Sequence, residues 1–236
     1  MQIKRDWTIT FDEEKISKAM GPSFDRLLRD SKRQQVWRTA LQEARELVQP
    51  AAVWDTFAIR EILHKKVVLA NGLRLGGGPV TTVVGGASDL TVAVCTAGQP
   101  IGDRVSLYQQ EKRLFEGMML SDLGSWAVDS VRQQLCHLLD EEAAQNGLRT
   151  STPLSPGESE WSVADQEVIF QLVDAGQIGV SLTSQMVMYP LKSLSLIMGI
   201  GSQPMGVEDG DSCMFCAMKD RCSYRELRPH GAAQTA

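Results

Sequence analysis

Three of the five cysteines lie within ten residues near the C-terminus, in the run Cys213-Met-Phe-Cys216-Ala-Met-Lys-Asp-Arg-Cys222. Two thiolates separated by two residues can hold one metal, and a third thiolate shortly after them can cap it. The spacing therefore predicts metal or iron-sulfur ligation. Chance spacing is the alternative, because one C-x2-C pair with a single extra cysteine is a weaker signal than two such pairs. A disulfide is less favoured, since neighbouring cysteines in an intracellular chain are more often ligands or redox thiols.

The composition is that of an ordinary globular protein. The 236 residues are 43% hydrophobic, which suits one large domain or two closely packed lobes. The start of the chain, from Met1 to Trp7, turns polar at once and does not resemble a signal peptide. No apolar run reaches the ~20 residues that cross a bilayer, so we expect a cytoplasmic protein without a membrane partner. The net charge of -5 argues against a general nucleic-acid surface.

Hydrophobic spacing predicts both helices and strands, without a regular alternation of the two. The expected helices cover residues 11–48, 101–115 and 120–146 and a segment from Ser162 to near Gly176; the expected strands cover 51–59, 90–98, 178–183 and 193–200, with a hairpin at Asn71-Gly72. This pattern predicts an α+β fold rather than a doubly wound sheet. The glycines at 76–78 and 85–86 fit turns, because neither group forms a phosphate-binding motif. No hydrolase-like catalytic constellation is present in the sequence.

Several motifs occur in a fixed order in the second half of the chain. Ser155-Pro156-Gly157 precedes a helical segment, Ile178-Gly-Val-Ser-Leu-Thr183 follows, and Met188-Tyr189-Pro190 leads into Lys192-Ser193-Leu-Ser195. This order resembles the activation domain of cobalamin-dependent methionine synthase. It is most similar to stand-alone relatives of that domain, whose pattern is Arg-Phe-Ser-Pro-Gly-Tyr-Gly-Asp-Trp, then Ile-Gly-Val-x-Leu-Thr, then Pro-x-Lys-Ser-Val-Ser. Those relatives also tend to end in a Cys-x-x-Cys cluster with a third cysteine that is followed shortly by Tyr/Phe-Arg, and Cys222-Ser-Tyr224-Arg225 fits that ending.

The resemblance implies a twisted, mainly antiparallel sheet with flanking helices. It also implies a role in the reductive activation of a corrinoid (cobalamin) protein or methyltransferase, as a corrinoid reductive activase component. The family binds S-adenosylmethionine, and the residues at the positions of its motifs, which are the implied cofactor-binding residues, are Ser155, Pro156, Gly157, Glu158, Tyr189, Lys192 and Ser193. Its partners would be the corrinoid protein and an electron donor protein.

Two positions depart from the family pattern. Pro153 stands where the first motif has arginine, and Glu158 stands where it has tyrosine. A proline cannot clamp a ligand carboxylate, and Glu158 would repel one, although it could attract an amino group or a sulfonium. These replacements argue against S-adenosylmethionine binding. Any redox role of the chain would therefore depend more heavily on Cys213, Cys216 and Cys222.

Two kinds of metal group are compatible with the three cysteines. Three thiolates can hold a [4Fe-4S] cluster whose fourth iron has another ligand, such as Cys95, a non-cysteine side chain or a small molecule. Zinc bound by Cys213, Cys216, Cys222 and His230 ranks second, because the spacing to His230 is longer than usual. Cys95, Cys136 and His137 are otherwise most simply structural.

Two functional hypotheses follow. In the first, the chain passes electrons through the C-terminal cluster to a corrinoid protein. In the second, it is a non-redox module that binds a corrinoid or S-adenosylmethionine and whose cysteines form a structural zinc site. We expect an N-terminal helical segment at 1–50, an activation-domain-like core at 51–205, the cysteine-cluster segment at 206–228 and a disordered tail at 229–236.

Overall fold

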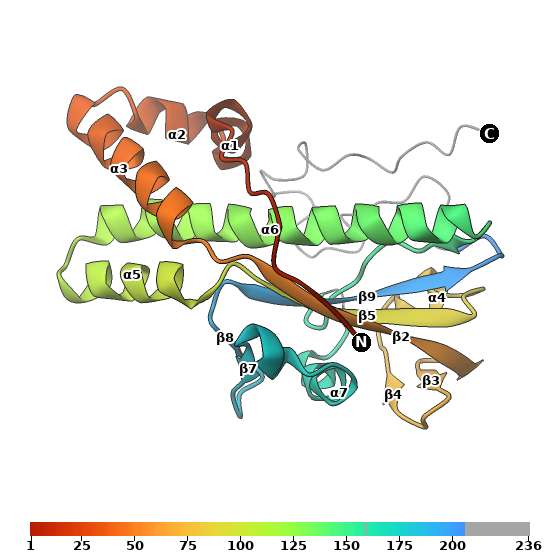
Figure 1. The fold of residues 1–236 in the computed structure, drawn as a ribbon. Coiled ribbons are helices and arrows are strands. Elements are labelled where there is room, and N and C mark those ends of the chain that lie inside the picture. The colour runs from red at the N-terminus through yellow and green to blue at the C-terminus, as the bar shows by residue number, and fades with distance from the viewer. Residues whose placement is uncertain (159, 206–236) are drawn as a thin grey trace.

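The computed structural model describes residues 1–158 and 160–205, and a central antiparallel sheet organises them (Figure 1). The sheet order is β4-β3-β2-β5-β9-β6, with β1 also paired to β2. Its strands are β1 (Gln2–Lys4), β2 (Ala51–Ile62), β3 (Val67–Leu69), β4 (Arg74–Leu75), β5 (Asp89–Thr96), β6 (Arg149–Thr150) and β9 (Ser193–Gly201). A separate two-stranded hairpin joins β7 (Ser181–Leu182) to β8 (Met188–Tyr189).

Helices cover both faces of this sheet. The long helix α6 (Leu114–Gln145) lies along one face, and α5 (Gln99–Gln110) packs beside it (Figure 1). The same side carries α1 (Glu13–Met20), α2 (Pro22–Leu27) and α3 (Ser31–Leu47). The opposite face is covered by α4 (Val80–Val83), α7 (Gln166–Leu172) and the 3-10 helix η2 (Ala175–Ile178), with η1 (Val163–Asp165) just before α7. Among the described residues, no helix has the length and apolar character needed to cross a membrane.

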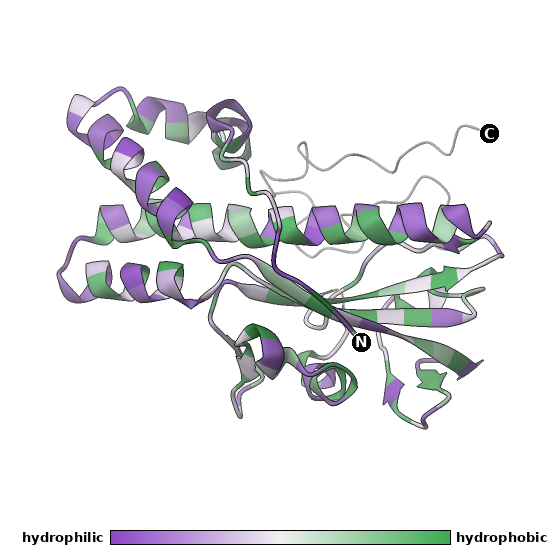
Figure 2. Ribbon diagram, viewed as in Figure 1, coloured by the Kyte–Doolittle hydropathy of each residue, from purple (hydrophilic) through white to green (hydrophobic). Residues whose placement is uncertain are grey.

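Alternate residues of the central strands enter two separate cores. On β5, Ala93 and Cys95 face α6, whereas Val92 and Val94 face α7. This follows from the two-residue period of a strand, in which successive side chains point to opposite faces. The central strands are therefore hydrophobic on both sides, while α3 and α6 show hydrophobic and hydrophilic bands (Figure 2). The register of the sheet is thus strongly specified.

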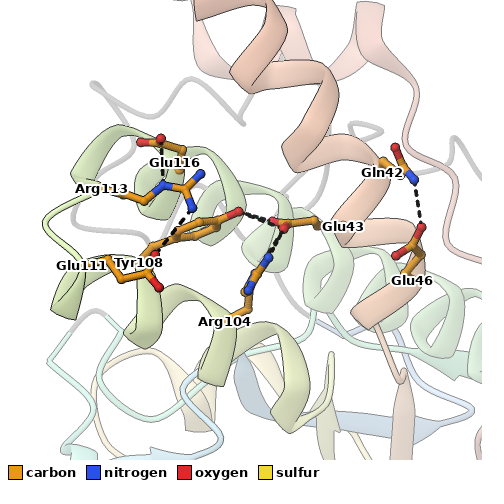
Figure 3. A network of polar contacts seen from close by, with 8 residues as sticks. All are labelled: Gln42, Glu43, Glu46, Arg104, Tyr108, Glu111, Arg113 and Glu116. Atoms are coloured by element: carbon orange, nitrogen blue, oxygen red, sulfur yellow. Dashed lines mark hydrogen bonds and ion pairs between the residues drawn. The ribbon is translucent and has the colours of Figure 1, made fainter.

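A polar network fastens the N-terminal helices to α5 (Figure 3). The Glu43 carboxylate of α3 accepts hydrogen bonds from Arg104 at 2.6 and 3.1 Å and from the Tyr108 hydroxyl at 2.7 and 2.8 Å. The Tyr108 ring also meets two guanidinium groups, with the carbon of Arg104 at 4.9 Å and that of Arg113 at 4.4 Å from its centroid. Because Tyr108 is only 2% exposed, this network fixes how α3 sits on α5.

The predicted α+β class with a mainly antiparallel sheet is confirmed, and most predicted elements are present. Several predicted bounds were wrong. The helix expected at 11–48 is divided into α1, α2 and α3, with the first break at Gly21, whose φ is 79°, and the helix expected at 101–115 ends at Gln110. The second long helix begins at Leu114 rather than near residue 120, because the turn before it is short and uses a positive φ of 60° at Lys112. The strand expected at 178–183 is reduced to Ser181–Leu182, since η2 and the left-handed Gly179 occupy its first half.

Candidate functional site

The segment from Tyr189 to Ser193 crosses the end of the sheet and enters β9. The Tyr189-Pro190 peptide is cis, Pro190 is buried, and the Tyr189 hydroxyl donates to Asp103 Oδ1 at 3.3 Å. The negative charge of Asp103 raises the pKa of Tyr189. The Ser193 hydroxyl hydrogen-bonds Thr96 Oγ1 at 2.9 Å, which ties the start of β9 to the end of β5. Tyr189 is therefore a surface group, and Ser193 is part of the sheet's own hydrogen bonding.

Lys192 is the chemically distinctive group of this segment. Its Nζ donates to the hydroxyls of Ser121 at 2.8 Å and Ser125 at 2.9 Å, both on α6. The stem of Lys192 passes over Gly124, where an added Cβ would lie 3.0 Å from Lys192 Cγ. Burial lowers the pKa of Lys192, while the nearby Asp122 carboxylate acts in the opposite direction. The result is a half-buried amine in a pocket of hydroxyl groups, with weakened hold on its proton.

The turn that holds Ser155 to Glu158 lies beside the middle of β9. Leu154 forms an isolated bridge with Ile197 of β9, and Pro156 is buried. Gly157 has a φ of 95°, which a residue with a side chain rarely adopts, and so it permits the reversal of the chain. The Ser155 N–H donates to Glu158 Oε2 at 3.1 Å.

Asp165 binds Trp161, whose backbone is hydrogen-bonded to Gly157 and Glu158 of the same turn. This buried carboxylate accepts the Trp161 indole N–H at 2.8 Å and the Gly76 backbone N–H at 2.7 Å. Lys66 approaches it at 3.1 Å. The glycines at 76–78 thus let the chain after β4 pack against Trp161. An added Cβ on Gly77 would lie 3.4 Å from the Trp161 ring. Their predicted role in turns agrees with this placement.

Arg132 is a functional candidate that sequence reasoning missed. Only 9% of it is exposed, and its Nε donates to Asp129 Oδ1 at 2.9 Å. Burial opposes its positive charge, but Asp129, Cys136 and Glu158 together raise its pKa. The signal was available: residue 132 falls on the same helical stripe as the buried Val128, Leu135 and Leu139, where a charge is unexpected.

Residues of both motif segments interact with one face of α6. Ser121, Ser125, Asp129 and Arg132 recur at spacings of four, four and three, so they share that face. Lys192 meets this polar row at Ser121 and Ser125, and the Glu158 carboxylate acts on it at Arg132. Seven helical residues from Ser125 to Arg132 correspond to about 10 Å at 1.5 Å each. The row therefore meets an amine at one end and carries a guanidinium paired with Asp129 at the other.

The predicted metal ligands Cys213, Cys216 and Cys222 lie outside the described residues, as does His230. Within residues 1–158 and 160–205, no group of three or more metal-binding side chains is present. Cys95 is fully buried in the core on β5, where burial raises the pKa of its thiol. Its predicted packing role is confirmed, and a thiolate ligand role is disfavoured. Cys136 packs partly buried against the same core, and His137 is an exposed residue whose Nε2 lies 3.3 Å from Glu141.

Comparison with known proteins gives one kind of match. No protein-family model matches the sequence, and no curated protein is detectably similar to it. Among solved structures, the chain is similar to the MetH reactivation domain, which was crystallised bound to AdoHcy. The TM-score is 0.61 with 13% sequence identity, over 87% of this chain and 80% of that one. This similarity shows that the two share a fold.

Proposed function

We propose that this chain is an accessory protein for the reductive activation of a corrinoid protein or cobalamin-dependent methyltransferase. The observation that carries the proposal is the likeness of fold to the MetH reactivation domain over most of both chains. The motif order from Ser155 to Ser195 supports it independently, since it was identified from the sequence alone. Its two partners would be the corrinoid protein and an electron donor protein.

Cys213, Cys216 and Cys222 would hold the group that passes the electron. Three closely spaced thiolates suit a [4Fe-4S] cluster, which supplies one-electron chemistry of the kind that returning Co(II) to Co(I) requires. Cys95 does not suit the fourth position, because its thiol is fully buried within the described core. A non-cysteine side chain or a small molecule therefore remains as the fourth ligand in this proposal.

The test is anaerobic purification of the full chain, with measurement of iron, zinc, sulfide and the visible spectrum. We expect iron, sulfide and broad visible absorption, and loss of all three in the Cys213→Ser, Cys216→Ser and Cys222→Ser variants. Cys136→Ser is the matched control, because it removes a thiol outside the proposed cluster. The reduced protein should convert cob(II)alamin to its Co(I) form. A colourless protein with stoichiometric zinc, or full activity in all three cysteine variants, would refute the electron-transfer role.

A second candidate function is ligand binding of the S-adenosylmethionine type, and Arg132 is the observation that favours it. Pro153 removes the guanidinium that the family motif carries, but Arg132 offers one on α6, beside the same turn. A guanidinium that is paired with Asp129 and feels the charge of Glu158 suits an amino-acid group, because the cation can bind its carboxylate and the anions its ammonium. A guanidinium from α6 would thus take the place of the motif guanidinium that Pro153 removes.

Calorimetric titration with S-adenosylhomocysteine tests this second function. We expect binding that weakens at least about tenfold in Arg132→Lys, because a lysine cannot reproduce bidentate contacts. Circular dichroism and urea unfolding of the same variant show whether it is folded. Absence of binding to the wild-type chain would leave the cysteine-based function standing and exclude this one.

A further inference from the structure

A groove distinct from the polar row on α6 opens at one end of the sheet. It has a volume of about 560 Å³ and lies where β2 begins and β5 ends. Five separate parts of the chain line it: Arg5, Gln49–Ala51, Gly98–Gln99, Gln177–Gly179 and Pro190. Lys192, which hydrogen-bonds Ser121 and Ser125, and Asp129, which hydrogen-bonds Arg132, do not belong to this lining. The size falls within the range of small-molecule sites.

The floor of the groove is apolar and firmly held. Ala51 and Pro190 are buried, and Pro50 and Ile178 are half-buried. Gly98 and Gln49 of the lining lie close together, because an added Cβ on Gly98 would lie 2.7 Å from the Cβ of Gln49. A flat, apolar or heteroaromatic group would be in van der Waals contact with such a floor.

The rim of the groove is rich in hydrogen-bond donors. Arg5 Nη2 donates to the Gln177 carbonyl at 2.6 Å, and no ion pair to Arg5 is found within residues 1–158 and 160–205. A guanidinium has five N–H donors, so four of them remain for a ligand. The groove lining includes no carboxylate.

Two carboxamides of the rim are held in place from outside. Gln99 Nε2 donates to Asp103 at 3.2 Å, and Gln177 Nε2 donates to Asp174 at 3.1 Å. Each amide NH2 group retains a second N–H. Fixed donors of this kind lose little entropy when a ligand binds, and together with Arg5 they favour an oxyanion.

We propose that this groove binds a small molecule that joins a flat, apolar or heteroaromatic body to a phosphate or carboxylate. The body lies on Pro50, Ala51, Ile178 and Pro190, and the oxyanion is bound by Arg5 and the amides of Gln99 and Gln177. This site is separate from the proposed corrinoid function and does not depend on it.

Adenosine monophosphate and benzoate are the probes, titrated calorimetrically into the full chain. They present a phosphate and a carboxylate, respectively, on a flat ring, and adenosine is the uncharged comparison. We expect at least one of the two anions to bind more tightly than adenosine. The Arg5→Met variant should weaken that anion at least about tenfold, since hydrogen bonds to charged groups contribute about 1.5–3 kcal/mol. Adenosine should bind the variant and the wild type equally.

Arg149→Met is the matched control, because Arg149 is an exposed arginine on β6 at a distance from the groove lining. It should leave the affinity unchanged. A second variant, Ile178→Asp, places a carboxylate in the lining and should weaken the binding of whichever anion binds the wild type, without removing Arg5. Arg132→Lys should have no effect, which separates this site from the one on α6. The proposal is overturned if neither anion binds, or if Arg5→Met and Arg149→Met give the same affinity as the wild type.

Discussion

Replacement of Asp165 by alanine should destabilise the protein by about 3 kcal/mol. The substitution leaves two buried donors, the Trp161 indole N–H and the Gly76 backbone N–H, without their acceptor. Each buried donor without a partner costs roughly 1–3 kcal/mol. Lys66 adds little to this sum, because its side chain is 41% exposed and exposed ion pairs contribute about 0–1 kcal/mol.

Two further variants separate the hydrogen bonds from the charge. Asp165→Asn can keep an oxygen at the Oδ2 position, where both buried donors bind, so it should cost about 1 kcal/mol, close to one ordinary hydrogen bond. Lys66→Met removes only the ion pair and should cost less than about 1 kcal/mol.

Urea unfolding followed by tryptophan fluorescence measures these free energies. The variants should differ in midpoint and keep the same slope against urea. The reasoning fails if Asp165→Ala costs less than about 1 kcal/mol, or if Lys66→Met is as damaging as Asp165→Ala, since the ion pair would then dominate.

Three other outcomes are expected. Tyr108→Phe removes the hydroxyl that donates to Glu43 and should cost about 1.5 kcal/mol in urea unfolding, whereas no loss would mean that the Glu43 contact is not stabilising. Lys192 should titrate below its ordinary pKa of 10.5, as measured by NMR of the ¹³C-methylated amine. Asp122→Asn should lower that pKa further, because the Asp122 charge favours the protonated amine. A rise of the pKa in this variant would contradict the reasoning. Burial raises the pKa of Asp140, so the folded state binds the proton of this carboxyl more tightly than the unfolded state does, and stability falls as pH rises from below 3.8 through the raised pKa. Asp140→Asn should flatten that part of the pH–stability curve. An unchanged curve would exclude Asp140 as the source of the fall.

The elements with strong hydrophobic periodicity were predictable from the sequence. The strand around Val92 and Val94 and the strand that begins at Ser193 are buried on both faces, and each contains consecutive apolar residues, at 92–95 and 196–198. The segment after Ile178 was misjudged, because a β-like composition was overruled by the left-handed Gly179 and a 3-10 turn. Short apolar segments cannot be assigned by composition alone.

The candidate site was only partly accessible to the same reasoning. The motif residues Lys192 and Glu158 were named from the sequence, but their neighbours on α6 were not. Lys192 and Ser121 are 71 positions apart, so no local sequence pattern predicts their contact. Arg132 was detectable as a charge on an apolar helical stripe, whereas its relation to Glu158 depends on the tertiary structure.

Gly98 has a consequence for how the groove could change in evolution. Because an added Cβ would lie 2.7 Å from the Gln49 Cβ and 2.9 Å from the Gln49 carbonyl oxygen, any larger residue there must separate β2 from the β5 exit. Its positive φ of 91° adds a second penalty. If the groove binds the proposed ligand, its selectivity is therefore more easily changed at other lining positions, such as Gln177 and Ile178, than at Gly98. Related chains with altered ligand preference should vary at those two positions and keep glycine at 98.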